Sequence, residues 1–160
     1  MTSEMKALVY EGPRIMNIRR QPVPQPGPHE VLIRVVYTGI CGSELSGYLG
    51  QNSLRKPPLV MGHEFSGLIE RTGSEVSPEL AVGMRVTVNP LISCYRCDYC
   101  LQGQQQLCRH RGLIGAKYPG SFAEFVVVPE QAVVPLPETM SMEDGALVEP
   151  LACAVRAAEQ

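Results

Sequence analysis

Four cysteines that lie close together constrain the fold of this chain more than any other feature. Cys94, Cys97, Cys100 and Cys108 form a C-x2-C-x2-C-x7-C array within the stretch CYRCDYCLQGQQQLC. The spacing of the first three allows one tight turn to point three sulfurs inward, and the longer arm brings the fourth sulfur round. Four thiolates favour a closed tetrahedral zinc site. Such a site is structural, because it leaves no coordination position for a substrate.

Two other uses of these cysteines fit the spacing less well. Bacterial ferredoxins also begin C-x2-C-x2-C, but their fourth cysteine comes sooner and is followed by proline, whereas Arg109 follows Cys108 here. A disulfide framework fails because three cysteines this close together cannot pair sensibly with one another. The sequence therefore predicts a zinc lobe at residues 93–111.

Composition limits the class of protein. The chain opens MTSEMKALVY, without the apolar segment of a signal peptide, and no apolar run approaches the roughly 20 residues that span a bilayer. Cys41 and Cys153 remain as free thiols, which indicates a reducing compartment, so we expect a cytoplasmic protein. The net charge of −2 and the 19% of charged residues predict binding to neither nucleic acid nor membranes.

The patterning predicts a mainly β fold. The 160 residues suffice for one domain, and 15 Gly and 14 Pro separate short apolar runs, as in a protein built of strands and turns. The alternating prolines in QPVPQPGPHE predict an extended surface loop, since proline cannot donate to a central strand ladder. The predicted strands are Met5–Tyr10, Met16–Arg20, Val31–Thr38, Gly67–Thr72, Met84–Val88 and Phe122–Val128.

Helical signals come late in the sequence. Ser141 and Asp144 resemble a capping box ahead of the apolar run Ala146–Val148. We expect Pro150 to end this helix and to stand at the start of a second one, LACAVRAAEQ. The second helix has no terminator before Gln160, which predicts a chain that is cut within a helix.

A second group of candidate ligands is spread over three segments. Cys41 lies in GICGSE, His63 and Glu64 lie in MGHEFSG, and Glu149 lies in LVEPLA. Each of these residues alone would be unremarkable, since a lone cysteine is most often a small buried residue. Together, a thiolate, an imidazole and a carboxylate give three ligands and an open fourth position, which is the form of a catalytic zinc site.

The motifs around these residues resemble one family. The stretch from Gly62 to Gly67, followed by Gly73 and Val76 at the right spacings, matches the zinc signature of the medium-chain alcohol dehydrogenases. The phrase ALVEPLACAVRA resembles the polyol and threonine dehydrogenase branch, which carries glutamate where liver-type enzymes use a cysteine as third zinc ligand. The resemblance covers nearly the whole chain.

This resemblance implies a GroES-like, partly open β-barrel at residues 1–150 that holds both zinc ions. Residues 151–160 would begin a helix that leads into a Rossmann domain missing from this chain. The full-length protein would use NAD or NADP on a small alcohol, polyol or carbonyl substrate, and would form a homo-oligomer. Sugar-phosphate alcohols remain open as substrates.

The implied chemistry assigns roles to two further residues. Zinc with an open position binds an alcohol and lowers its pKa, and hydride then passes to the nicotinamide. The resemblance implies that Ser43, two residues after Cys41, relays the proton. Threonine dehydrogenases and liver-type enzymes place a histidine a few residues on, where this sequence has Ser46, so threonine is disfavoured as substrate.

The sequence leaves open which of two carboxylates is the third ligand of this zinc. Adjacent side chains of an extended chain point to opposite faces, so His63 and Glu64 would need a bent backbone to bind one ion. That argument favours Glu149, with Glu64 behind the metal. In the family, however, the glutamate beside the histidine can swing in and bind.

The chain lacks a visible cofactor motif. It contains no G-x-G-x-x-G turn to cradle a dinucleotide. We therefore expect a catalytic domain that is inactive by itself. The alternatives are a non-catalytic zinc-binding scaffold or interaction module, which has no use for an open Cys/His/Glu site, and an electron carrier, which iron absorption would reveal.

Overall fold

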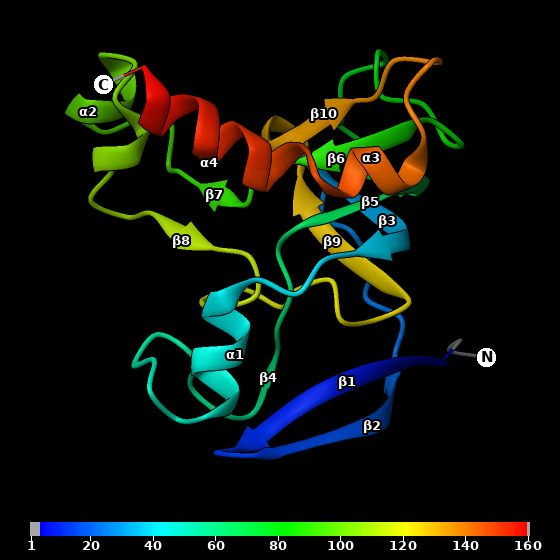
Figure 1. Ribbon diagram of the computed structural model, residues 1–160. Coiled ribbons are helices and arrows are strands. Elements are labelled where there is room, and N and C mark those ends of the chain that lie inside the picture. The colour runs from blue at the N-terminus through cyan, green and yellow to red at the C-terminus, as the bar shows by residue number, and fades with distance from the viewer. Residues whose placement is uncertain (1–3, 160) are drawn as a thin grey trace.

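The computed structural model describes residues 4–159 and shows three antiparallel sheets (Figure 1). A small sheet has the order β2-β1-β4, a five-stranded sheet has the order β10-β6-β5-β3-β9, and a two-stranded ribbon pairs β7 with β8. The strands are β1 Glu4–Gly12, β2 Ile15–Pro22, β3 Glu30–Thr38, β4 Leu59–Val60, β5 Phe65–Thr72, β6 Arg85–Val88, β7 Leu91–Ile92, β8 Gly112–Leu113, β9 Phe125–Pro129 and β10 Val133–Pro135.

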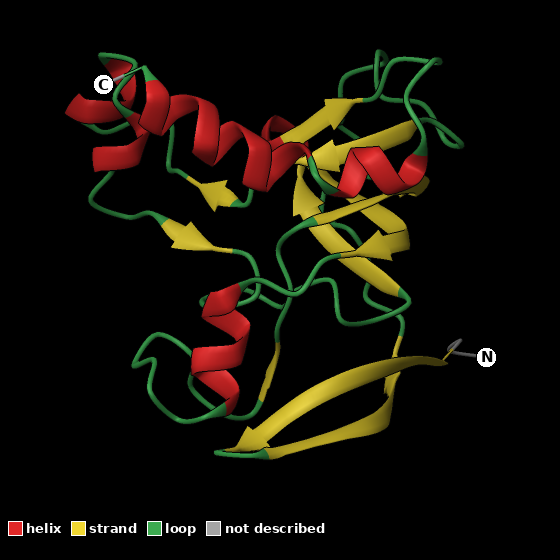
Figure 2. Cartoon of the chain, viewed as in Figure 1, coloured by secondary structure: helices red, strands yellow, loops and turns green. Residues whose placement is uncertain are grey.

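Helices are few and short, and they lie at the edges of the sheets (Figure 2). This arrangement confirms the predicted mainly β class. No helix among residues 4–159 has the length and apolar character needed to cross a bilayer. The helices are α1 Gly42–Tyr48, α2 Asp98–Leu101, α3 Met142–Ala146 and α4 Val148–Ala158, with 3-10 turns η1 Gln105–Leu107 and η2 Glu130–Ala132.

The core lies against the five-stranded sheet. The first half of strand β3 is buried on both faces, since Val31 and Ile33 join the main core whereas Leu32 packs with Met5 and Val23. Each such side chain stabilises the fold by about 1.5–3 kcal/mol relative to an exposed one. The double burial explains why residues 31–33 form a continuous apolar run. The main core comprises Val31, Ile33, Phe65, Ile69, Val86, Val88, Ile114, Val126 and Val128.

The last predicted strand begins three residues later than expected. Residues 122–124 do not extend β9, because the Phe122 carbonyl accepts from Leu8 N–H and Glu124 N–H donates to the Lys6 carbonyl. The backbone here turns toward β1 and thereby ties the small sheet to the large one. Strands β4, β7, β8 and β10 were too short, at two or three residues each, to leave an alternating pattern.

The first late helix begins as predicted, but the break before the second helix falls elsewhere. The Ser141 side chain accepts from Asp144 N–H, so the cap at the start of α3 is confirmed. The break falls at Leu147, and Pro150 is the third residue of α4, where an amide N–H has no intrahelical partner in any case. The prediction that Pro150 ends the first helix is therefore wrong, as is the start of the second helix at residue 151, whereas the place of Pro150 in the first turn of the second helix is confirmed.

Candidate metal centres

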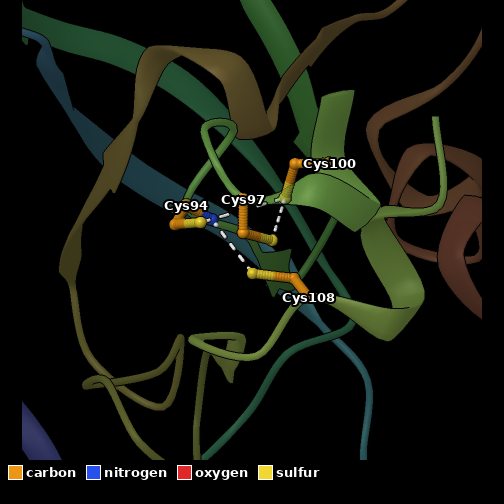
Figure 3. A group of neighbouring side chains, drawn as sticks. All are labelled: Cys94, Cys97, Cys100 and Cys108. Carbon is orange, nitrogen blue, oxygen red and sulfur yellow. Dashed lines mark hydrogen bonds between the residues drawn. The ribbon is translucent and has the colours of Figure 1, made fainter. Parts of the chain in front are cut away.

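The four cysteines of the lobe converge on one point (Figure 3). Their sulfurs all lie within 4.8 Å of one another, with Cys94 Sγ 4.0 Å and Cys97 Sγ 3.5 Å from Cys100 Sγ. A zinc tetrahedron with bonds near ~2.3 Å has sulfur–sulfur edges of about 3.8 Å. A disulfide needs ~2.05 Å, and all of these cysteines are free thiols. The geometry therefore fits a four-thiolate zinc site.

Backbone hydrogen bonds favour the thiolate form, which binds a cation, in two of these cysteines. Cys108 Sγ accepts from the N–H groups of Cys94 at 3.3 Å and His110 at 3.4 Å, and the Cys94 contact is the main cause that lowers the pKa of Cys108. A backbone hydrogen bond from Cys100 is likewise the main cause that lowers the pKa of Cys97 to about 6. Burial raises the pKa of Cys100 to about 12. Binding of a cation would therefore release protons from the lobe.

Cys41 is presented by a helix that the sequence analysis missed. Cys41 is the N-cap of α1, and the Glu44 side chain reaches back to accept from Cys41 N–H at 3.1 Å. Gly50, with φ of 76°, adopts the left-handed conformation that follows many helices. Two of the seven residues of α1 are glycines, which lower its intrinsic helix propensity, so propensity alone does not predict this helix. The glutamate three residues after the N-cap was the available signal.

His63 lies at the centre of the second candidate site. Ligand atoms of Cys41, Glu44 and His63 lie within 4.8 Å of one another, and so do those of His63, Glu64 and Glu149. The two groups share His63, which is 6% exposed. The structure thus gathers all four sequence-predicted residues of this site around one imidazole, with Glu149 supplied by the first turn of α4.

Glu64 is not turned away from this site. Gly62 has φ of 97° and the backbone bends at Glu64, so the chain is not extended where the alternation of side chains was assumed. The Glu64 carboxylate packs against Gly39, where a β-carbon would lie 2.6 Å from Glu64 Oε2. Ligand atoms of Glu64 and Glu149 lie within 4.8 Å of each other and of one His63 nitrogen, so either carboxylate could serve, and the preference for Glu149 stays a prediction.

Two charged residues behind His63 were missed from the sequence. Glu44 Oε1 accepts from His63 Nδ1 at 2.8 Å and from Arg55 Nη2 at 2.9 Å, and the side chains of this ion pair are 2% and 1% exposed. Because Nδ1 faces Glu44, Nε2 is the nitrogen left for a metal. Glu44 fits an orienting partner better than a ligand. Nothing in the pattern around Arg55 signals its burial.

Burial and neighbouring charges shift the pKa values of His63 and Glu44 in opposite directions. Burial is the largest influence on His63 and lowers its pKa, but the hydrogen bond and charge of Glu44 outweigh it, so the His63 pKa is raised. Burial likewise raises the pKa of Glu44, yet His63 and Arg55 together bring it below its ordinary value. The site thus holds Glu44 as a carboxylate and His63 as its donor.

Ser43 lies at the edge of this centre on the first turn of α1. It is half-buried, and its Oγ accepts from Arg55 Nη2 at 3.0 Å. Ser46, at the position where other branches place a histidine, donates to the Ser43 carbonyl at 3.0 Å. Ser46 is therefore engaged with the backbone of its own helix.

The glycines of the signature allow backbones to approach closely. A β-carbon on Gly67 would lie 2.5 Å from the Arg34 carbonyl oxygen, and one on Gly73 would overlap the carbonyl oxygens of Gly27 and Pro28. Both contacts are with backbone, which cannot move aside cheaply. These positions hold the strand that follows His63 against its neighbour.

Comparison with known proteins identifies the class. The sequence model of the family "Alcohol dehydrogenase GroES-like domain" matches residues 27–138, so the chain belongs to this family. The resemblance inferred from the zinc signature and the predicted partly open GroES-like barrel are thereby confirmed.

Three similar proteins illustrate the relationship. The chain is 43% identical over 139 residues to D-arabitol-phosphate dehydrogenase of Enterococcus avium, covering 86% of this chain and 39% of that protein. It is 39% identical over 165 residues to the probable D-xylulose reductase A of Neosartorya fischeri, covering 99% and 46%. A crystal structure of a candidate zinc-binding dehydrogenase from Sinorhizobium meliloti 1021, bound to NADP, superposes with a TM-score of 0.90 at 38% identity, covering 98% and 45%.

The chain spans less than half the length of these three proteins. The relatives are oxidoreductases that act on small alcohols or polyols, and this chain corresponds to one portion of such a protein.

Proposed function

We propose that this chain is the catalytic domain of a zinc-dependent dehydrogenase that oxidises an alcohol or polyol with NAD or NADP. The observation that carries the proposal is the pair of ligand groups that share His63, one with Cys41 and Glu44 and one with Glu64 and Glu149. A thiolate, an imidazole and carboxylates in two groups that share one imidazole suit a catalytic zinc that keeps an open position. The four-cysteine lobe would hold a second, structural zinc.

The donor set determines what the bound metal would supply. Zinc in such a site acts as a Lewis acid that polarises a substrate oxygen. The residues of the chain would do the rest. Cys41, His63 and Glu149 would hold the ion, with Glu44 fixing the imidazole so that Nε2 faces it, and Glu64 would lie behind the metal or exchange into the shell.

The reaction releases one hydride and one proton. A bound dinucleotide would accept the hydride from the carbinol carbon, and Ser43, two residues from Cys41 on α1, would take the hydroxyl proton. The product is a carbonyl compound and the reduced dinucleotide. Positioning the nicotinamide is worth ~7–11 kcal/mol, so a separate nucleotide-binding domain has to provide it.

The substrate class follows from the relatives. D-arabitol-phosphate dehydrogenase and D-xylulose reductase both carry the names of enzymes for five-carbon polyols or their ketoses. We propose a polyol or a polyol phosphate as substrate. A cytoplasmic location and a homo-oligomeric full-length protein remain predictions that fractionation and light scattering would check.

One experiment separates this function from a scaffold role. The full-length protein and the 160-residue chain are assayed with NAD and NADP against xylitol, D-arabitol and D-arabitol phosphate. We expect dinucleotide reduction by the full-length protein only, and no saturable dinucleotide affinity of the 160-residue chain by calorimetry. A full-length protein that binds zinc in the lobe alone and reduces no dinucleotide with any polyol would support the scaffold alternative. Iron in the preparation would support an electron carrier.

A further inference from the structure

Arg55 is buried beside the second candidate site without being a metal ligand. Its side chain is 1% exposed, and its Nη2 donates both to Glu44 Oε1 at 2.9 Å and to Ser43 Oγ at 3.0 Å. Burying a guanidinium is costly unless it is paired, so this placement needs a compensating role. Glu44 supplies the counter-charge, but the contact with Ser43 is not needed for charge balance.

The neighbouring chain is shaped to admit this side chain. A β-carbon at Gly47, on the same helix as Ser43, would lie 2.6 Å from Arg55 Cγ and 3.0 Å from Arg55 Cβ. The backbone N–H of Arg55 is held by the Asn52 carbonyl at 3.1 Å. The absence of a β-carbon at Gly47 therefore lets the stem of Arg55 pack closely against helix α1, where its guanidinium reaches Ser43 Oγ.

The direction of the hydrogen bond restricts the Ser43 hydroxyl. A guanidinium only donates and does not lose its proton, so Ser43 Oγ must accept from Arg55. The Ser43 O–H then points away from Arg55, and one lone pair remains beside it. Without Arg55 the hydroxyl would rotate freely, and Glu44 would stand as an uncompensated buried charge next to His63.

We propose that Arg55 is a positioning residue, which fixes the Ser43 hydroxyl in the orientation that meets the substrate oxygen and at the same time neutralises Glu44. The proposal rests on the proposed dehydrogenase function and deepens it. Arg55 acts on the reaction through Ser43 and touches neither substrate nor metal. A charged hydrogen bond of this kind corresponds to about a tenfold effect on rate.

A kinetic cycle in the full-length protein tests the proposal. Arg55→Gln should lower kcat about tenfold and change KM less than about twofold, because the lost interaction matters in the transition state. In a Ser43→Ala background the same substitution should lower kcat by clearly less than tenfold, because only the loss of Glu44 neutralisation then remains. Arg55→Lys, which keeps a donor and a charge, should recover part of the loss, and Arg34→Gln on the exposed face of β3 serves as the matched arginine control.

A measurement on the 160-residue chain tests the contact without activity. In 15N-edited NMR, exchange of the Arg55 guanidinium protons should become several-fold faster in Ser43→Ala, which removes one acceptor, and should be unchanged in Ser46→Ala. Equal losses of kcat in both backgrounds without recovery by lysine would overturn the proposal, as would unchanged exchange in Ser43→Ala. A wild-type full-length protein without dehydrogenase activity would instead overturn the proposed function, and the role of Arg55 with it. If Arg55→Gln fails to fold, the cycle with Arg55→Lys decides.

Discussion

The carboxylate of Glu44 lies 2.8 Å from Nδ1 of His63, and both side chains are buried. Glu44 is the third residue of the short helix that Cys41 caps, so one helical turn fixes a thiol and the partner of an imidazole together. The imidazole comes from a bend 19 residues away. This contact selects which ring nitrogen faces the metal position, which makes Glu44 as important to the site as the ligands themselves.

Loss of the lobe metal should destabilise the chain. Cys97→Ser removes one of four thiolates, and we expect the zinc content to fall from about two ions to one per chain, with a lower Tm, because a structural zinc site contributes folding free energy directly. Atomic absorption and calorimetry measure both effects. Cys153→Ser, at an exposed thiol outside the lobe, is the matched control and should leave the lobe zinc in place.

The two carboxylates beside His63 should differ in their importance for metal binding. We expect Glu149→Gln to weaken Co²⁺ binding at the second site about tenfold or more, and Glu64→Gln to weaken it less. Titration followed by the thiolate-to-cobalt absorption band resolves the two. Glu143→Gln, on the neighbouring helix α3, controls for charge. A larger effect at Glu64 would reverse the assignment of the third ligand.

Removal of the Ser43 hydroxyl should slow the reaction and spare the metal. In the full-length protein, Ser43→Ala should lower kcat by about 10²-fold or more at unchanged zinc content, because no other hydroxyl lies at this position to take the substrate proton. Ser46→Ala is the control, since that hydroxyl is occupied by the Ser43 carbonyl. Near-normal turnover of Ser43→Ala would exclude Ser43 from the mechanism.

A methyl group on Gly73 should cost stability. Its β-carbon would overlap the carbonyl oxygens of Gly27 and Pro28, so Gly73→Ala should lower the free energy of unfolding by roughly 1–3 kcal/mol. Gly42→Ala has nothing within 4 Å of the added carbon and should be neutral or slightly stabilising in its helix. Urea unfolding of the two variants gives the comparison.

The first hairpin should contribute to the acid sensitivity of the fold. A hydrogen bond from Arg19 is the main cause that lowers the pKa of Glu11 to about 2 from its ordinary value of 4.5. A depressed folded-state pKa means that the stabilisation is present above pH 4.5 and is lost as the pH falls toward 2. Glu11→Gln should therefore be less stable than wild type at neutral pH, with a difference that disappears at pH 2. Thermal unfolding across this range checks the sign, and a difference that persists at pH 2 would contradict it.

The sequence by itself determined the features that depend on local spacing. The four lobe cysteines could be assigned because their ligands fall within one short segment, where the chain length between sulfurs limits the geometry. Four strands of the large sheet, β3, β5, β6 and β9, could be predicted because burial on a sheet selects apolar side chains along each run, as in Val31–Ile33. The signature glycines identified the family because they encode close backbone contacts.

Only the tertiary structure decided how the second site is assembled. The bend at Gly62 brings Glu64 alongside His63, although alternation along an extended chain predicted opposite faces. The ion pair of Glu44 with Arg55 depends on the path of the loop after α1 and on the absence of a β-carbon at Gly47. No local pattern marks such contacts, because packing of the whole domain brings the partners together. Glutamate and arginine are also residue types that usually lie on the surface.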